Sequence, residues 1–254
     1  MVFDISEYGN TIYHNPERYD DQYWWKKNDI EFWKKIYNNI SGKNILELGS
    51  GTGRLAIPLI KEGANYTGVE ISEEYSKYSK KQLNQYSNSF KIITTDFRNF
   101  NFNIKSDMIF IGFNSFLHLL NDNDAMEFLK SVKTHMHEKT KFYVDIFVPN
   151  PDFLYNSDER IKKFEYIDSK TNETIYVDEI CQYDSSTEIM KVFWIYYSEN
   201  KQEEEYQFTM KMYYPDTMNR LITDSGLYIN NLWGDYEFNE FNELSELQIY
   251  ECTI

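Results

Sequence analysis

The most informative segment of this 254-residue chain reads Ile45-Leu46-Glu47-Leu48-Gly49-Ser50-Gly51-Thr52-Gly53. An apolar strand enters a turn that holds three of the chain's ten glycines at alternate positions. Glycine adopts positive φ without strain and lets a ligand approach the backbone closely. The free N–H groups of a helix that starts here would attract an anionic group. The segment therefore predicts a ligand-binding turn between a strand and a helix, and a tight turn that binds nothing is the alternative.

Strand-like and helix-like segments alternate on both sides of this turn. Short apolar strands are expected at 44–49, 64–70, 90–94, 106–111 and 141–148. Helical spacing of apolar residues predicts helices at 23–40, 52–62, 72–85 and 124–137, with Ser72 as an N-cap and with His135 and His137 on the surface. This alternation is typical of parallel strands joined by crossover helices, which is a doubly wound α/β sheet.

The pattern changes after Pro149-Asn150-Pro151. Four β-like stretches follow, at about 160–167, 173–184, 188–198 and 204–214, separated by polar turn clusters. They predict an antiparallel meander, and a helix (215–226) and two strands (227–233 and 245–253) then close the chain. We therefore divide the chain into an N-terminal arm or lid (1–22), an α/β core (23–150), an antiparallel β insertion (151–214) and a closing helix and strand pair (215–254).

Composition narrows the class of protein. Lys and Arg number 26 against 41 Asp and Glu, so the net charge is −15, and no basic cluster that would meet nucleic-acid phosphates is present. Two cysteines suit a reducing compartment. The N-terminus resembles no signal peptide and no apolar run could span a bilayer, so we expect a cytoplasmic protein without membrane contact.

Two kinds of nucleotide site compete for the glycine turn. The dinucleotide fingerprint G-x-G-x-x-G would need its third glycine where Arg54 stands, so a nicotinamide oxidoreductase is disfavoured. The spacing E-x-G-x-G-x-G instead resembles motif I of the class I S-adenosylmethionine-dependent methyltransferases. This resemblance implies a mostly parallel, Rossmann-like sheet of seven strands and S-adenosyl-L-methionine as cofactor, with S-adenosyl-L-homocysteine as product.

Further segments resemble the same family in the same order along the chain. Gly68-Val69-Glu70-Ile71 resembles the end of the family's second strand, where an acid accepts hydrogen bonds from the ribose hydroxyls. Thr95-Asp96-Phe97 resembles its adenine-binding turn, and Ile111-Gly112-Phe113-Asn114 resembles its motif IV. Tyr19-Asp20-Asp21-Gln22-Tyr23 is similar to the arm of sugar-amine N-methyltransferases, whose tyrosines cap the cofactor. The residues that this resemblance assigns to the cofactor are Tyr19, Tyr23, Glu47, Gly49, Ser50, Gly51, Gly53, Glu70, Ile71, Asp96, Phe97, Phe113 and Asn114.

Two residues are candidates for the acceptor side. His118 follows the fourth strand, where related amine methyltransferases place a His or Tyr facing the methyl group. Asp145 lies inside the apolar fifth strand, where a buried carboxylate must be paired or serve a ligand. For each, a purely structural role is the alternative: His118 packed against the next helix, Asp145 capping a loop. The histidines and cysteines lack metal-ligand spacing, so no metal site is expected.

We therefore expect a methyltransferase that methylates a small molecule, foremost at an amine nitrogen. The acidic composition favours a cationic acceptor, although this concerns encounter only. A non-catalytic S-adenosylmethionine-binding partner protein is the main alternative. We expect the insertion and the N-terminal arm to cover the acceptor site. The alternating aromatic residues of the insertion would face the acceptor site on one side and solvent on the other; they are Phe164, Tyr166, Tyr176, Tyr183, Phe193, Tyr196 and Tyr197. A dimer interface is the alternative role of the insertion, so a homodimer stays open.

Overall fold

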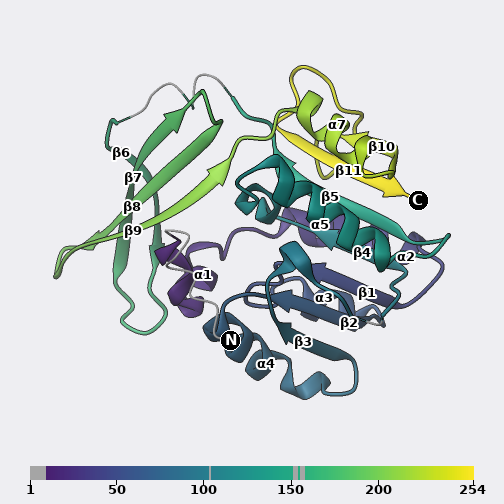
Figure 1. The fold of residues 1–254 in the computed structure, drawn as a ribbon. Helices are drawn as coiled ribbons and strands as arrows, with labels where there is room; N and C mark the ends of the chain where they lie inside the picture. Colours follow the sequence, from purple (N-terminus) through teal and green to yellow (C-terminus); the bar gives the residue numbers. More distant parts are fainter. Residues whose placement is uncertain (1–9, 103, 151–153, 155–157) are drawn as a thin grey trace.

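The computed structural model describes residues 10–102, 104–150, 154 and 158–254 (Figure 1). Most of the expected arm (1–22) can therefore be followed from residue 10 onward, and residues 1–9 lie outside the described part. The same holds for residues 151–153 and 155–157, where the expected insertion begins. None of the described helices is both long enough and apolar enough to cross a membrane.

A seven-stranded mixed sheet forms the centre of the fold. Its strands are β1 (Asn44–Leu48), β2 (Asn65–Glu70), β3 (Phe90–Thr94), β4 (Met108–Ile111), β5 (Lys141–Phe147), β10 (Tyr228–Trp233) and β11 (Leu247–Thr253). They lie in the order β10-β11-β5-β4-β1-β2-β3, and only the pairings of β11 with β5 and with β10 are antiparallel. The predicted doubly wound, mostly parallel sheet of seven strands is confirmed.

Helices cover both faces of this sheet. One apolar core contains residues of α2 (Asn28–Asn39), α3 (Ala56–Lys61) and the end of α4 (Glu73–Leu83). The other contains residues of α5 (Asp122–Thr134) and α7 (Pro215–Asp224) together with the inner face of the insertion. Because every central strand is covered on both sides, its residues are apolar nearly without interruption, as in β4 (Met-Ile-Phe-Ile).

The insertion forms a second, antiparallel sheet of four strands. These are β6 (Ile161–Ile167), β7 (Thr174–Asp184), β8 (Ile189–Ser198) and β9 (Lys201–Lys211), paired in sequence order. The hairpin between β8 and β9 is tighter than the turn cluster predicted, because Ser198 pairs directly with Lys201. Figure 1 shows this sheet beside the α/β core, with the short helix α1 (Pro16–Gln22) between them.

Two sequence expectations about helices are wrong. The helix predicted over 23–40 begins five residues late, because α1 ends at Gln22 and a non-helical connection of residues 23–27 precedes α2, which starts at Asn28. The apolar spacing misled because Trp24 and Trp25 in the connection are 62% and 54% exposed and belong to no buried face.

His135, expected on the surface, is fully buried. Helix α5 ends at Thr134, so the chain turns inward and the His135 ring stacks on Phe100 at 4.5 Å between centroids. Its Nε2 accepts a hydrogen bond from the backbone N–H of Phe102 and its Nδ1 donates to the carbonyl of Ser131. Both ring nitrogens are therefore satisfied, and the role of this histidine is structural. His137 is half-buried and contacts Asp107.

Candidate active site

A cavity of about 330 Å³ lies where the α/β core, the N-terminal segment and the insertion meet. The core contributes the loops at the carboxyl ends of β1, β2, β3 and β4, which is the edge where open α/β sheets bind ligands. The predicted site residues that line it are Tyr19, Tyr23, Gly49, Gly51, Glu70, Ile71, Asp96, Phe97, Phe113, Asn114 and His118. Of the remaining predicted residues, all within the described part of the chain, Glu47, Ser50, Gly53 and Asp145 do not line it.

The glycine turn uses its three glycines in different ways. All three have positive φ, from +55° to +83°. A Cβ added at Gly51 would meet no atom within 4 Å, so this glycine leaves open space beside the cavity. A Cβ at Gly53 would contact Ser79 of α4 instead. Ser50 is buried and packs against Gly68. A Cβ added at Gly68 would lie only 2.7 Å from the Ser50 Oγ, so the close packing requires glycine there. Gly51 thus borders the cavity, whereas Gly53 packs against α4 and Ser50 packs against β2.

Glu47 lies beneath the turn and is buried. Its carboxyl group accepts a hydrogen bond from the hydroxyl of Tyr66 on the neighbouring strand. Burial raises the pKa of Glu47 to about 8. The side chain is therefore directed into the sheet rather than toward the cavity.

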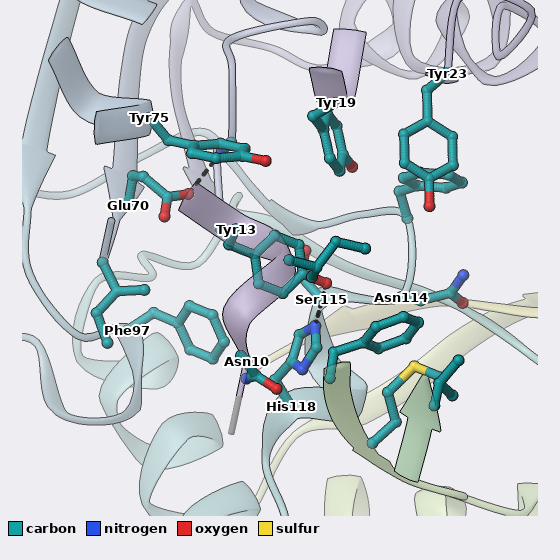
Figure 2. A pocket seen from close by; sticks show the side chains of 18 of the residues that line it. Asn10, Tyr13, Tyr19, Tyr23, Glu70, Tyr75, Phe97, Asn114, Ser115 and His118 are labelled. Atoms are coloured by element: carbon teal, nitrogen blue, oxygen red, sulfur yellow. Dashed lines mark hydrogen bonds between the residues drawn. The ribbon is translucent and has the colours of Figure 1, made fainter. Parts of the chain in front are cut away.

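Glu70 ends β2 and its carboxylate joins two loops. One oxygen accepts the backbone N–H of Gly51 and the other that of Ser72, both at 2.8 Å. Burial raises the pKa of Glu70, although these backbone donors oppose the rise. Each carboxylate oxygen can accept more than one hydrogen bond, so Glu70 retains acceptor capacity on its cavity side (Figure 2). Ser72 caps α4 by accepting the N–H of Tyr75, which confirms the predicted N-cap.

Asp96 and Phe97 follow β3. The Asp96 carboxylate accepts hydrogen bonds from the backbone N–H and the Nε of Arg98, both at 2.8 Å. The Phe97 ring packs edge-on against Phe128 of α5, 5.6 Å between centroids. The ion pair fixes the carboxylate and the packing fixes the ring, so both enter the cavity in defined positions.

The loop after β4 is strained and is held from β5. Phe113 and Asn114 both have left-handed backbones, with φ of 49° and 68°, which costs free energy in residues other than glycine. The Asp145 carboxylate accepts the Phe113 N–H at 3.1 Å, and the Asn114 Oδ1 accepts the Phe147 N–H at 2.9 Å. Asp145 also accepts the hydroxyl of Tyr236 at 2.9 Å, and burial raises its pKa. This geometry corresponds to the loop-capping alternative for Asp145.

His118 lies on the cavity wall at the end of a short 3-10 helix (Ser115–His118). Its Nδ1 faces the carbonyl of Thr209 on β9 at 3.0 Å, so this nitrogen carries the proton and donates it. Its Nε2 therefore accepts the hydroxyl of Tyr13 at 2.8 Å (Figure 2). Burial lowers the pKa of His118 to about 4. The imidazole is neutral at neutral pH, and its one lone pair is already occupied by Tyr13.

Four tyrosines line the cavity: Tyr13, Tyr19 and Tyr75 on the side of Glu70, and Tyr23 across from it (Figure 2). Tyr19 lies 4.6 Å from Tyr23 and 5.6 Å from Tyr75 between ring centroids, and Tyr13 lies 6.2 Å from Tyr75. Burial raises the pKa of all four hydroxyls, so all stay protonated. The buried Tyr75 hydroxyl has no hydrogen-bond partner among the described residues. Sequence reasoning missed Tyr13 and Tyr75, which belong to no motif.

The insertion closes the cavity with one face of its sheet. The lining residues there are Lys163, Glu179, Val192, Trp194, Phe208 and Met210. None of the seven alternating aromatic residues that the sequence divides between the cavity face and solvent is among the described lining residues. The expected alternation holds, because Trp194 turns inward while the Tyr197 hydroxyl bonds Asp178. The two-residue alternation of side chains along a strand predicts which residues face inward but not which of them reach the cavity.

Metal ligation is not apparent in the part of the chain that the structure describes, since no group of three or more His, Cys, Asp or Glu residues there could hold an ion.

Comparisons with known proteins agree with this geometry. A family model described as a methyltransferase domain matches residues 45–139. Among curated proteins, YqeM of Bacillus subtilis (strain 168), named as a methyltransferase, is 32% identical over 89 residues, which cover 35% of this chain. The match spans only 36% of that relative's own length.

Solved structures match over nearly the whole chain. A S-adenosylmethionine-dependent methyltransferase from Clostridium acetobutylicum ATCC 824 has a TM-score of 0.76 at 18% identity, covering 92% of both chains. The CcbJ methyltransferase of Streptomyces caelestis has a TM-score of 0.80 at 18% identity, covering 89% of this chain and 95% of its own. The sugar N-methyltransferase KedS8 of Streptoalloteichus sp ATCC 53650 has a TM-score of 0.70 at 10% identity, covering 90% and 89%. At these identities the likeness concerns the fold.

Proposed function

Since the chain belongs to the class I S-adenosylmethionine-dependent methyltransferase family, we propose that it transfers a methyl group from S-adenosylmethionine to an amine nitrogen of a small molecule. The family and its cofactor, both predicted from the motifs, are confirmed by the family model together with the fold. The observation that carries the proposal is that the cofactor motifs of the core and a separate wall supplied by the insertion face each other across one shared cavity.

The residues at the core end of the cavity fit this cofactor. Gly51 leaves open the space in which the methionine moiety would lie beside the backbone, and a Cβ would fill it. The spare acceptor capacity of Glu70 suits two ribose hydroxyls, and Asp96 with Phe97 suits the adenine. The unpartnered hydroxyl of Tyr75 points to a polar ligand group in the same space. Tyr19, within α1, and Tyr23, at the C-terminal end of α1, would cover the bound cofactor.

When bound, the cofactor supplies an electrophilic methyl group. The chain's residues then need to hold an acceptor lone pair in line with it and exclude water, since proximity and orientation supply much of the rate. Phe113, Asn114 and the Tyr13–His118 pair would border the acceptor. Because His118 has a pKa of about 4 and its Nε2 is occupied, it is a weak base. We therefore infer that the amine enters already neutral, and that His118 chiefly orients Tyr13.

The wall of the insertion supports a small acceptor. Trp194, Phe208 and Met210 present apolar and aromatic surface, and the whole cavity of about 330 Å³ is at the lower end of small-molecule sites. Structures of similar fold are named as methyltransferases of sugars and of a glycopeptide. The net charge of −15 opposes a nucleic-acid substrate.

A turnover assay tests the proposal. The purified protein is incubated with S-adenosylmethionine and a library of small amines, alcohols and thiols, and S-adenosylhomocysteine and methylated product are measured by mass spectrometry. The expected result is product formation with at least one primary or secondary amine. Tight cofactor binding without any product from amines, alcohols or thiols would favour the non-catalytic binding protein. Product from hydroxyl acceptors alone would replace the amine in the proposal.

A further inference from the structure

One buried carboxylate on the insertion wall is not explained by any cofactor motif. Glu179 of β7 is only 3% exposed and lines the cavity. One carboxylate oxygen accepts the Lys163 Nζ and the other the Trp194 Nε1, both at 2.8 Å. The Lys163 side chain belongs to β6 and that of Trp194 to β8, so three adjacent strands converge on this group. All three residues line the cavity.

The backbone is specifically shaped to bring Lys163 to this position. Strand β6 has a register shift against β7 between Lys162, which pairs with Asp178, and Phe164, which pairs with Val177. Lys163 is therefore the extra residue of a β-bulge. Bulges re-aim a side chain and occur preferentially near functional sites. Here the bulge turns an ammonium group to the cavity face of the sheet, where it meets Glu179.

Stability alone gives little reason for this cluster. Removing two charges from water costs free energy, and apolar residues of similar volume often stabilise a protein as well as a buried ion pair does. The surrounding wall is apolar at Val192, Phe208 and Met210, so apolar residues would suit the same position. A buried, hydrogen-bonded carboxylate on a rigid sheet instead suits the recognition of a ligand donor.

The donors already present define what the ligand can offer. A carboxylate has about four acceptor positions. Lys163 and Trp194 each donate to one of these positions. The neighbouring Cys181 thiol also interacts with Glu179. Burial raises the pKa of this thiol to about 12, so the thiol stays protonated. At least one position therefore stays available for a further donor. Since Lys163 already neutralises Glu179, a second ammonium group would meet repulsion, whereas a hydroxyl group would not.

We propose that Glu179, held by Lys163 and Trp194, binds a hydroxyl group of the acceptor, and that the acceptor is an amino alcohol whose amine is the methylated nitrogen. This inference rests on the proposed function, because it assumes that the acceptor binds at the end of the cavity formed by the insertion. It narrows the acceptor from small amines in general to amines that carry a hydroxyl group remote from the reacting nitrogen.

Equilibrium binding tests the inference without requiring turnover. Protein saturated with S-adenosylhomocysteine is titrated calorimetrically with linear amino alcohols from aminopropanol to aminohexanol. Each is compared with the alkylamine and the diaminoalkane of the same carbon count. For at least one length the wild type is expected to bind the amino alcohol about tenfold or more tightly than the alkylamine, as for a hydrogen bond to a charged group. The diaminoalkane is expected to bind less tightly than the amino alcohol.

Three variants separate recognition from structure. E179Q is expected to reduce the preference for the hydroxyl group to a few-fold or less. D178N is the matched control, because Asp178 is the adjacent residue on β7 but pairs with Arg160, away from the cavity, and it should keep the preference. K163M leaves Glu179 without its cation, so here the order should reverse, with the diaminoalkane bound more tightly than the amino alcohol.

The outcomes distinguish this inference from the proposed function. Equal binding of alkylamines and amino alcohols at every length, or an equal loss of preference in D178N and E179Q, would overturn the inference. Methylation of amines without any hydroxyl preference would do the same while leaving the proposed function standing. A hydroxyl preference that depends on Glu179, in a protein that methylates no amine, would support the inference and reject the proposed function.

Discussion

The Asp145 carboxylate, on β5, accepts the backbone N–H of Phe113, on the neighbouring loop after β4, at 3.1 Å. It thereby secures the first of two consecutive left-handed residues at the edge of the cavity. Tyr236 bonds the same carboxylate oxygen and in turn accepts the Lys26 Nζ at 3.1 Å. A buried polar chain therefore connects the closing segment and the start of α2 to the loop beside the acceptor.

We expect D145N to lower turnover more than it lowers cofactor affinity. The neutral amide oxygen of asparagine is a weaker acceptor than the carboxylate oxygen that binds both the Phe113 N–H and the Tyr236 hydroxyl. The left-handed Phe113–Asn114 pair, which costs roughly 1–3 kcal/mol per residue, therefore loses part of its support. The free energy of unfolding should fall by about 1–3 kcal/mol. Steady-state kinetics, cofactor calorimetry and denaturant unfolding measure these effects. Y236F, which keeps the bond between Asp145 and Phe113, should have the smaller effect on turnover; wild-type turnover in D145N would contradict this positioning role.

E70A should weaken S-adenosylmethionine binding roughly 10- to 100-fold, because charge-assisted bonds to the ribose would be lost. The variant also leaves the N–H groups of Gly51 and Ser72 without their acceptor. We therefore expect an additional loss of about 1–3 kcal/mol in the free energy of unfolding. Calorimetry and denaturant unfolding are the two measurements. E73A, which removes an exposed carboxylate three residues later, is the control, and equal affinities of E70A and wild type would exclude Glu70 from the site.

G51V should abolish cofactor binding because its side chain would occupy the open space beside the turn. Valine at positive φ is strained at any position. The control must therefore be a glycine-to-valine variant that introduces the same backbone strain away from the cavity. G63V provides it: Gly63 also has positive φ, at +103°, and lies at the end of α3, where a Cβ would meet only the Tyr37 hydroxyl at 3.9 Å. Both variants should lose stability, but only G51V should lose cofactor affinity. Similar affinities in the two variants would contradict the placement of the methionine moiety.

Local signals in the sequence sufficed for most of the core. Strand β3 was predicted at its observed bounds, and the glycine turn was placed correctly, because apolar runs and glycines at fixed spacing are properties of neighbouring residues. The same local signal failed at 23–40, where exposed tryptophans have the spacing of a buried helix face. Nothing in the segment itself distinguishes Trp24, which faces water, from Trp33, which is fully buried.

The acceptor end depends on contacts between distant segments. Tyr13 and His118 are 105 residues apart, and their hydrogen bond exists only because the N-terminal segment lies across the end of β9. Glu179 meets Lys163 through a bulge whose position depends on the pairing of β6 with β7. Asp145 is a buried acid, as its position in an apolar strand predicts. Its partners, Phe113 and Tyr236, could not be named without the sheet order.

The pH dependence of turnover should follow the acceptor and not His118. With a pKa of about 4, His118 stays neutral across neutral and alkaline pH. An alkylamine with a pKa near 10 is mostly protonated at neutral pH, so kcat/KM should rise about tenfold per pH unit up to the pKa of the acceptor. A less basic acceptor should move the inflection by the difference between the two pKa values. An inflection near pH 6.5 that disappears in H118N would instead identify His118 as the proton acceptor.

The same burial of His118 should make stability fall as the pH falls. In the unfolded chain the histidine titrates near 6.5, whereas in the folded protein its pKa is about 4. Between these values the unfolded state binds a proton that the folded state does not, so acidification from about pH 7 to pH 5 should cost roughly 2 kcal/mol. H118N should lack this part of the loss, while carboxylates such as Glu70 contribute equally to both proteins. Denaturant unfolding at the two pH values measures the difference, with H14N at an exposed histidine as the control. An equal pH dependence in wild type, H14N and H118N would mean that the His118 ring can be protonated within the folded protein.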